Sequence, residues 1–171
     1  MNVLKTIRNR DVGLPALDFV LRKERFAARA VLLMGEKVAL MYGSTDNYYK
    51  LPGGGIEDGE ELEDALAREL LEETGCEATV EMEIGQIIEE RAEEGFRQVS
   101  VAYIAKQFGD IVTPTLTEKE IAAGFEVRWA DSVDRAIELV DGATSENGGS
   151  KFMRERDGTF LRVARELLSE Q

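Results

Sequence analysis

The sequence predicts an α/β (α+β) fold in which a central mixed sheet carries helices on both faces. Hydrophobic residues make up 43% and charged residues 32% of the 171 residues, which is typical of a globular chain. The predicted elements run as strands, one helix, more strands and final helices, an order that favours layers of sheet and helix. The sequence has no internal repeat and no long low-complexity linker. We therefore expect one domain over residues 1–171.

The first half of the chain is predicted to consist mainly of strands that precede one helix. Gly35-Glu36 is a turn signal, so the strands on either side of it should form a hairpin. Acidic residues crowd the first turn of the helix, and Gly75 suits the position just after its end. The predicted elements are an edge strand and loop within 1–24, strands at 27–34, 37–42 and 48–51, a break at Pro52 and Gly53–Gly55, and a helix over 60–74.

The second half is predicted to contain more strands and two helices. Gly85 should form a bulge or bend between two strands, and Ser132 is a suitable N-cap for the next helix. Gly158 can interrupt the terminal amphipathic helix. The predicted elements are strands at 78–83, 84–91 and 98–108, a long connection at 109–124 with a helical turn at 118–123, a strand at 125–130, a helix at 132–140, a polar loop at 142–150 and a helix within 151–169.

Composition removes several kinds of catalytic chemistry. Cys76 is the only cysteine and histidine is absent, which excludes intramolecular disulfides, thiolate zinc sites and histidine-dependent triads. An enzyme with this composition would rely on carboxylates, lysines or a hard metal ion, and the chain has 34 Asp and Glu residues.

The charge and hydropathy patterns restrict the partners. A net charge of −13 predicts repulsion of long polyanions, so we expect no bulk nucleic acid, although a divalent cation would still allow small phosphates to bind. No apolar run approaches the roughly 20 residues of a membrane span, and the N-terminus has no signal-peptide core. We therefore expect no membrane partner and a cytoplasmic location.

Residues 54–76 hold nine carboxylates, a density that is also typical of a solvated helix. Their placement is more informative than their number. At about 100° per residue, Glu69, Glu72 and Glu73 fall on or beside the apolar arc of the helix that faces the protein. A solvated helix would turn its glutamates outward, as this one does with Asp64.

Three carboxylates on a protein-facing surface repel one another and lose hydration, which is unfavourable without compensation. Partial exposure in a cleft, the neighbouring Arg68 or a bound cation could each compensate. Oxygen ligands favour Mg²⁺, Mn²⁺ or Ca²⁺ over softer metals. The three glycines at 53–55 would let a backbone group approach a ligand closely. In isolation an ordinary turn after Pro52 is the commoner explanation, but beside the glutamate cluster we favour the close approach.

The same segment resembles the Nudix box, G-x5-E-x7-R-E-U-x-E-E-x-G-U, in which U is aliphatic. The only departure is Cys76, a small and readily buried residue at an aliphatic position. The strand order around the box is also similar to that of the family. The chain thus resembles the Nudix hydrolases, including MutT-like and ADP-ribose pyrophosphatase-like members. The residues that fill the fixed positions at unchanged spacing are Gly54, Glu60, Arg68-Glu69-Leu70, Glu72-Glu73 and Gly75.

The resemblance implies an α/β/α sandwich that hydrolyses nucleoside diphosphates linked to another moiety, with Mg²⁺ or Mn²⁺ as cofactor. Glu72 and Glu73 would bind metal, and Glu69 would be a metal ligand or the base that acts on water. Arg68 would orient a glutamate through a charge-assisted hydrogen bond. The remaining implied roles are metal ligation by the Gly54 carbonyl and structural support of the box by Glu60 and Gly75.

Residues outside the box are assigned less directly. Members often use a further glutamate as general base, and Glu118 and Glu120 are the candidates here, although a solvated loop charge is the commoner role. Several residues could contact substrate, although packing or a surface position is the commoner role for each. For the basic cluster on the terminal helix, Lys151, Arg154 and Arg156, we favour a solvated helix face. The candidate substrate contacts are Tyr42, Tyr48, Tyr49, Lys50, Arg91, Phe96 and Arg97.

Two further hypotheses compete with a pyrophosphohydrolase acting on a nucleoside triphosphate, ADP-ribose or a nucleotide sugar. A Nudix-fold regulator would bind a nucleotide without cleaving it, but such proteins usually have degraded boxes. A Nudix-type isomerase normally uses histidine, which this chain lacks. The expected partner is thus a small nucleotide-type substrate, and family members are frequently homodimers.

Overall fold

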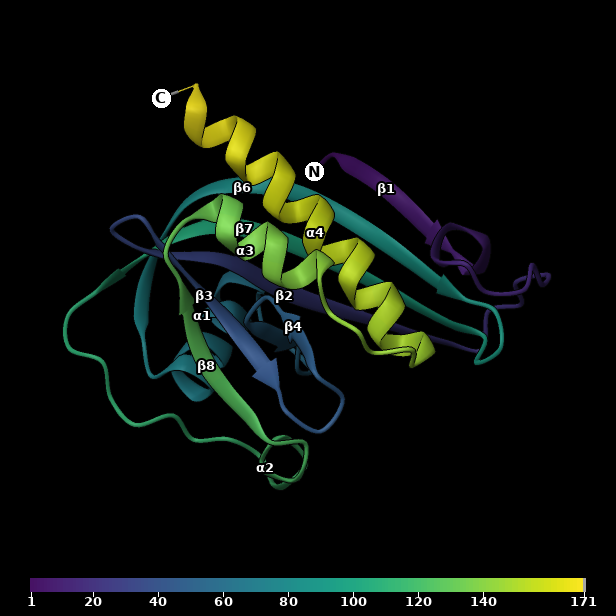
Figure 1. Ribbon diagram of the computed structural model, residues 1–171, viewed down its shortest axis with the longest axis horizontal. Coiled ribbons are helices and arrows are strands. Elements are labelled where there is room, and N and C mark those ends of the chain that lie inside the picture. Colours follow the sequence, from purple (N-terminus) through teal and green to yellow (C-terminus); the bar gives the residue numbers. More distant parts are fainter. Residues whose placement is uncertain (171) are drawn as a thin grey trace.

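The computed structural model describes residues 1–170, which form one 8-stranded mixed sheet flanked by helices (Figure 1). Its elements are β1 (Val3–Arg8), the short 3-10 helix η1 (Asn9–Val12), β2 (Lys23–Met34), β3 (Lys37–Gly43), β4 (Tyr48–Lys50), β5 (Gly53–Gly55), α1 (Leu62–Thr74), β6 (Glu77–Arg91), β7 (Phe96–Phe108), α2 (Glu118–Ala122), β8 (Phe125–Ala130), α3 (Val133–Asp141) and α4 (Gly148–Ser169). None of the helices in this range has the length and apolarity needed to span a bilayer.

The sheet is mixed, as the sequence predicts. Its strand order is β1-β6-β7-β2-β3-β4, with β5 paired to β2 and β8 paired to β3. The pairs β1–β6 and β2–β7 are parallel, and the remaining pairs are antiparallel. Alternate residues of the long strand β2 therefore point to opposite faces of the sheet, and each face is covered by helices.

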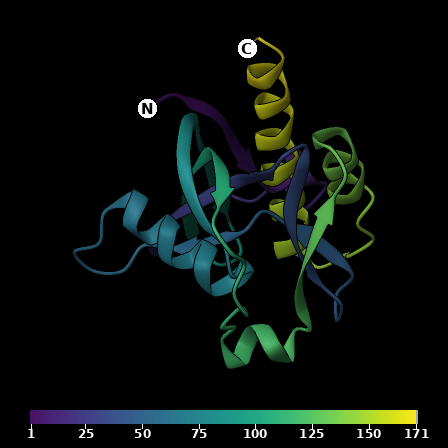
Figure 2. The same ribbon diagram turned by 90° about the vertical axis from the view of Figure 1, so that its left-hand side faces the viewer.

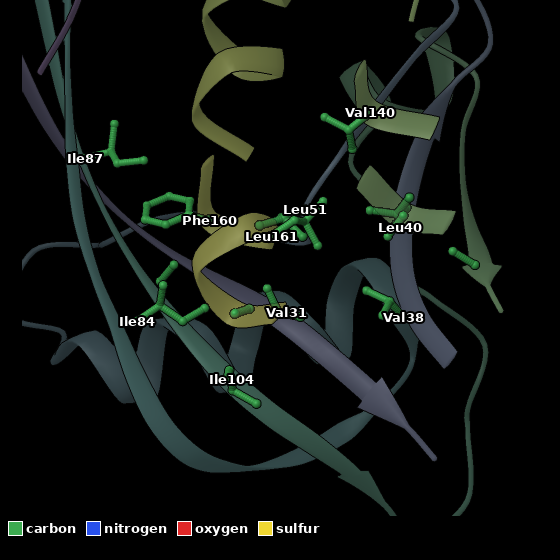
Figure 3. Packing of buried hydrophobic residues seen from close by; sticks show 14 of the residues in the cluster. Val31, Val38, Leu40, Leu51, Ile84, Ile87, Ile104, Val140, Phe160 and Leu161 are labelled. Atoms are coloured by element: carbon green, nitrogen blue, oxygen red, sulfur yellow. The ribbon is translucent and has the colours of Figure 1, made fainter. Parts of the chain in front are cut away.

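Helices cover the sheet on two sides, which confirms the α/β/α sandwich (Figure 2). Helix α1 packs Leu66 and Leu70 against one face, on a cluster that includes Leu32 and Val101. Helices α3 and α4 cover the opposite face (Figure 3). The side chains that α4 buries there, against Val31, Ile87 and Ile104, are Phe152, Phe160, Leu161 and Ala164.

Three predictions about elements were wrong in detail. The two strands predicted at 78–83 and 84–91 are one strand, β6, because β7 pairs along its whole length and absorbs Gly85 as an irregularity of register. The terminal helix starts earlier, at Gly148, and it continues through Gly158, which is buried where α4 meets Asp141. The three glycines predicted as a break form β5, which pairs with residues 27–29 of β2.

Gly75 is required by a close crossing of two segments. It ends α1 with a positive φ of 71°, and its carbonyl accepts a hydrogen bond of 2.9 Å from the Val112 amide. A Cβ at this position would lie 1.8 Å from the Val112 carbonyl oxygen. The 109–124 connection therefore crosses the end of α1 at a point where only glycine fits.

We expect Gly75→Ala to destabilise the fold more than a glycine replacement at a similar φ in open space. Gly13 provides the matched control, because its φ is 74° and a Cβ added there would have nothing within 4 Å. Gly13→Ala should lose about 1–2 kcal/mol for the left-handed backbone alone, and Gly75→Ala should lose a further 1–3 kcal/mol, roughly, from the clash. Urea unfolding of both variants measures the difference. Equal losses of unfolding free energy in the two variants would contradict a clash with the Val112 carbonyl.

Candidate active-site cleft

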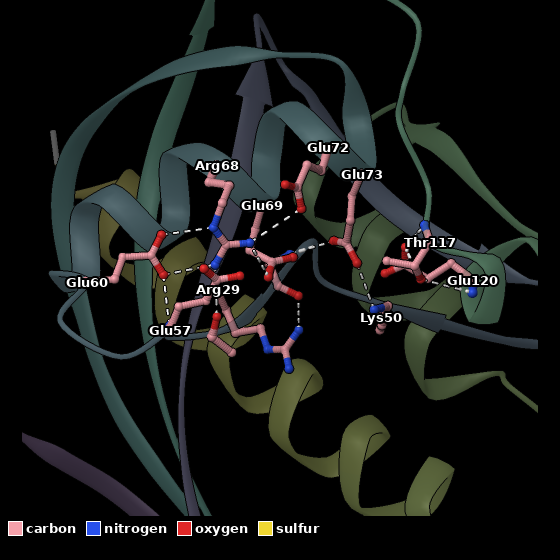
Figure 4. A network of polar contacts seen from close by, with 12 residues as sticks. Arg29, Lys50, Glu57, Glu60, Arg68, Glu69, Glu72, Glu73, Thr117 and Glu120 are labelled. Atoms are coloured by element: carbon pink, nitrogen blue, oxygen red, sulfur yellow. Dashed lines mark hydrogen bonds and ion pairs between the residues drawn. The ribbon is translucent and has the colours of Figure 1, made fainter.

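A cleft of about 610 Å³ opens beside the C-terminal half of α1, between that helix, the glycine strand β5 and helix α4 (Figure 4). Although the chain is strongly acidic, more cations than carboxylates line this cleft. Such a lining favours an anionic ligand, because nearby positive charge attracts anions in a water-restricted site. The charged residues of the lining are Arg25, Arg29, Lys50, Arg68, Arg91 and Arg156, with Glu57, Glu69, Glu72, Glu73 and Glu120.

The structure brings the three predicted glutamates of α1 into the lining of this one cleft. The three side chains differ in exposure. Glu73 is 2% exposed, Glu69 is 14% exposed and Glu72 is 43% exposed. Asp64, which the helical pattern places on the outer side, is exposed. The helix therefore presents three carboxylates of graded exposure, from the buried Glu73 beside β5 to the partly exposed Glu72.

Glu73 is held by the last residue of β4 and the first residue of β5. Its Oε1 accepts a hydrogen bond of 2.9 Å from Lys50 Nζ, and its Oε2 accepts one of 2.7 Å from the Gly53 amide. The Lys50 ammonium also lies 4.7 Å from the centre of the Phe125 ring. A buried carboxylate with a charged partner and a backbone donor is fully compensated in this arrangement.

Arg68 connects the loop before α1 to the carboxylates on the helix. It donates hydrogen bonds of 2.9 Å to both oxygens of Glu60 and one of 3.0 Å to Glu69, and its contact with Glu72 is longer, at 3.4 Å. Glu60 also accepts from the Glu57 amide at 2.9 Å. The Arg68 hydrogen bonds and then this amide lower the pKa of Glu60 to about 2. Glu60 is thereby fixed as an anion that holds Arg68 in place.

Glu69 has the opposite electrostatic setting. Burial raises the pKa of Glu69, Arg68 opposes this, and the charges of Glu73 and Glu72 raise it further. Gly54 lies directly against this carboxylate, because a Cβ on Gly54 would be 2.3 Å from its Cδ. Only glycine leaves room for the Glu69 carboxylate beside the β5 backbone.

The residues fit a hard metal ion by chemistry, although they are not arranged as a ready-made cage. Within residues 1–170, no three acidic side chains are gathered as metal ligands, since Glu73 is paired with Lys50 and Glu69 with Arg68. The potential metal ligands beside the glycine strand are carboxylate and carbonyl oxygens, which suits Mg²⁺ or Mn²⁺. Burial and the neighbouring carboxylates raise the pKa of Glu69, so a cation beside it would be favourable, and Gly54 gives its carboxylate room against the β5 backbone.

The structure separates the two candidates for a general base. Glu120 lines the cleft, where its carboxylate accepts hydrogen bonds of 2.8 Å and 2.9 Å from the amide and hydroxyl of Thr117. Glu118 is exposed and does not line the cleft. The capping box of α2 thus gives the Glu120 carboxylate a fixed position at the rim.

The candidate substrate contacts divide in the same way. Lys50, Arg91 and Phe96 line the cleft, whereas Arg97 is paired with Glu90 and Glu24 outside it. The tyrosines are packed on other aromatic rings: Tyr42 lies 4.8 Å from Tyr49, and Tyr48 meets Phe125 edge-on. None of the three tyrosines is part of the cleft lining.

The prediction of a solvated helix face was wrong for Arg156. Its side chain is buried, with hydrogen bonds to Glu89 (3.0 Å) and to both oxygens of Asp157 (2.7 Å and 3.1 Å). The Asp157 carboxylate also accepts from the Leu51 amide at 2.9 Å, which ties α4 to the strand that leads into the glycines. The spacing of Arg156 from the buried rings of Phe152 and Phe160 could have revealed it, since residues four apart share a helix face.

Three neighbouring strands complete the cleft with polar residues, of which the sequence singles out only Arg91. Arg25 of β2 pairs in register with Gln98 of β7, which pairs with Glu89 of β6. The Gln98 amide donates to Glu89 at 2.9 Å, and Arg91 donates to the same carboxylate at 2.9 Å. Residues of β2, β6 and β7 therefore share one charged wall below α4.

Comparisons with known proteins agree with this fold. A family model described as the NUDIX domain matches residues 20–141, and the chain belongs to this family. An RNA pyrophosphohydrolase from Wolbachia sp. subsp. Drosophila simulans (strain wRi) is 61% identical over 31 residues, which is 18% of this chain and 19% of that protein. The match thus spans about a fifth of the length of this curated relative.

Solved structures with low sequence identity share the fold. The E. coli ORF135 protein has a TM-score of 0.62 at 19% identity, covering 87% of this chain and 94% of that one. An ADP-ribose pyrophosphatase from Streptococcus suis 89-1591 has a TM-score of 0.53 at 16% identity, covering 82% of this chain and 92% of that one. At these identities the likeness establishes the arrangement of the sheet and helices.

Proposed function

We propose that this chain is a Nudix hydrolase that cleaves a phosphoanhydride bond in a nucleoside diphosphate derivative, with Mg²⁺ or Mn²⁺ as cofactor. The observation that carries the proposal is the shared cleft: three carboxylates of one helix face a lining that is otherwise rich in cations. Carboxylates suit a divalent metal, and arginines and lysine suit phosphate oxygens. Membership of the NUDIX family supports the same conclusion.

The proposed roles divide the residues of α1 and its preceding loop into metal ligands and the groups that hold them. Glu69, Glu72 and Glu73 would hold the metal together with the Gly54 carbonyl. When bound, the metal would neutralise phosphate charge and lower the pKa of water. Arg68 would orient Glu69 and Glu72, and Glu60 would hold Arg68, through the hydrogen bonds that the three acidic residues now accept.

Glu120 is proposed as the general base in preference to Glu118. It lines the cleft from α2, whereas the predicted glutamate ligands of the metal come from α1. A base on a separate element can take a proton from water without being part of the metal site. The Thr117 amide and hydroxyl would hold its carboxylate in a defined orientation.

The size and polarity of the cleft favour a small substrate. A volume of about 610 Å³ suits one nucleotide-sized molecule, and the acidity of the remaining surface opposes a long polyanion. We propose a nucleoside triphosphate, ADP-ribose or a nucleotide sugar as substrate. The names of the similar proteins, which refer to RNA and ADP-ribose pyrophosphohydrolysis in those proteins, support the same bond type.

A turnover screen tests the proposed function. The purified chain should release phosphate, pyrophosphate or a nucleoside monophosphate from at least one member of a panel of triphosphates, ADP-ribose and nucleotide sugars. Release should require Mg²⁺ or Mn²⁺ and stop in EDTA, and product identification by chromatography should locate the cleaved bond. Tight nucleotide binding without turnover would contradict the enzyme and favour a nucleotide-binding regulator.

The same proposal includes the extent of the domain. Strand β1 and helix α4 lie outside the matched residues 20–141, yet β1 pairs with β6 and α4 packs on the common core. We therefore propose one domain over residues 1–171, of which Gln171 lies outside the described residues. A homodimer and a cytoplasmic location stay predictions.

A further inference from the structure

Arg29 is a buried cation without an acidic partner. It lies in the middle of β2, is 5% exposed and lines the cleft. Its one side-chain hydrogen bond goes to the carbonyl oxygen of Gly53, and its Nε has no partner in the described part of the chain. Among residues 1–170, no carboxylate lies within 4.0 Å of its nitrogens.

The other buried or partly buried cations around the cleft are compensated. Arg156 is paired with Glu89 and Asp157, Arg91 is paired with Glu89, and Lys50 is paired with Glu73. Two carboxylates, those of Glu89 and Asp157, thus lie among the three arginines Arg29, Arg91 and Arg156. These arginines outnumber the carboxylates, and Arg29 is the one that has no carboxylate of the described residues in contact.

Leaving this charge without an ion-pair partner is unfavourable, because burial removes its hydration and the carboxylates of Asp157, Glu73 and Glu89 attract it only from beyond ion-pair distance. Burial and then repulsion from Arg156 lower the pKa of Arg29 to about 10, although the charges of Asp157, Glu73 and Glu89 oppose the shift. The guanidinium nevertheless remains protonated at neutral pH. The buried Nε without a partner among the described residues, on an arginine that lines the cleft and has no carboxylate in contact, indicates a ligand with negative charge.

The neighbouring Arg25 extends this surface toward solvent. Arg25 and Arg29 are four residues apart on β2, so they point to the same face of the sheet, with only the small Ala27 between them. Arg25 is exposed, and its guanidinium lies against Gly55, where a Cβ would be 2.6 Å from its Nε. One arginine thus lies at the floor of the cleft and the other at its mouth.

We infer that Arg29 and Arg25 form an anion subsite for a phosphate group of the substrate, on the α4 side of the cleft and separate from the carboxylates of α1. Figure 4 shows the Arg29 side chain below the α1 carboxylates, on the side of α4. A guanidinium offers parallel N–H donors that match two oxygens of one phosphate. The subsite rests on the proposed function for the identity of its ligand, but it binds the anion through protein groups alone and needs no metal.

Binding of inorganic pyrophosphate in EDTA tests the subsite without any turnover. Isothermal titration calorimetry on the full chain should detect pyrophosphate binding by the wild type, and we expect at least tenfold weaker binding by Arg29→Met. Arg25→Met should weaken binding by a smaller factor, because Arg25 is exposed. The control is Arg135→Met, an exposed arginine of α3 paired with Glu138, which should bind as the wild type does.

A second measurement separates ligand binding from a structural role. Without ligand, Arg29→Met should melt at the same temperature as the wild type or higher, because the variant removes an unpaired buried charge. The inference would be overturned if Arg29→Met melted at a clearly lower temperature and still bound pyrophosphate as tightly as the wild type. If Arg29→Met does not fold, the inference would be overturned by an Arg25→Met variant that binds pyrophosphate as tightly as the wild type. Absence of pyrophosphate binding to a wild type that turns over substrate with Mg²⁺ would also overturn it, while leaving the proposed function intact.

Discussion

The Glu73→Gln variant should lose Mg²⁺-dependent turnover by at least about 10²-fold, because a lost metal ligand removes several kcal/mol of charge stabilisation in the transition state. The fold should survive the change. Glutamine keeps the shape of the side chain, and its amide oxygen can still accept the hydrogen bond that Glu73 receives from the Gly53 amide. Steady-state kinetics on the best substrate of the screen, with circular dichroism as a check of folding, measures both effects.

A control on the same helix makes this test specific. Asp64 is exposed on the outer side of α1, so Asp64→Asn removes one carboxylate without touching the cleft. Its turnover should match that of the wild type. If a folded Glu73→Gln enzyme turned over at the wild-type rate, the assignment of Glu73 to the metal site would be wrong.

The Arg156→Met variant should lose about 3–5 kcal/mol of stability, because removal of one partner leaves buried carboxylates uncompensated. Glu89 and Asp157 are both fully buried, and Arg156 donates to each of them. The loss should appear as a lower midpoint of urea unfolding. Arg162→Met on the same helix is the control, since Arg162 forms an exposed pair with Asp141 that should contribute at most about 1 kcal/mol.

The stability loss of Arg156→Met should also depend on pH. Burial would raise the pKa of Glu89, but Arg156 and Arg91 outweigh burial, so the pKa of the folded wild type is below the ordinary value of 4.5. A lowered folded pKa means that Glu89 stabilises the wild type above its unfolded pKa and that this contribution is lost as the pH falls. The variant lacks the main cation, so its deficit should be largest at neutral pH and shrink as Glu89 becomes protonated. A deficit that stays constant from pH 7 to pH 4 would contradict this account.

The box helix could be predicted from the sequence because its information is local. Glu69, Glu72 and Glu73 belong to one helix whose apolar pattern sets their direction, and the structure places all three in one cleft. The strand at 125–130 and the helix capped by Ser132 were equally predictable, since each has local signals at its ends.

The charged wall below α4 could not be predicted in the same way. Arg29, Glu89 and Arg156 are far apart in the sequence, and their contacts depend on strand register and on the docking of α4. A cation within the apolar run 27–34 was a local signal that Arg29 is unusual, but it did not identify a partner. The register of β6 was similarly hidden, because only pairing with β7 keeps the strand continuous across Gly85.

The docking of α4 has a consequence for how the protein reaches its active form. The cleft contains Arg25 near the beginning of the chain and Arg156 near its end, and Asp157 holds the Leu51 amide beside the glycine strand. Contacts between such distant residues form slowly, since the intervening chain must first be ordered. During synthesis, therefore, α1 can form long before the cleft exists. Catalytic competence should accordingly appear only in the last step of folding, and regained activity after denaturation should follow the docking of α4 rather than the return of helical content.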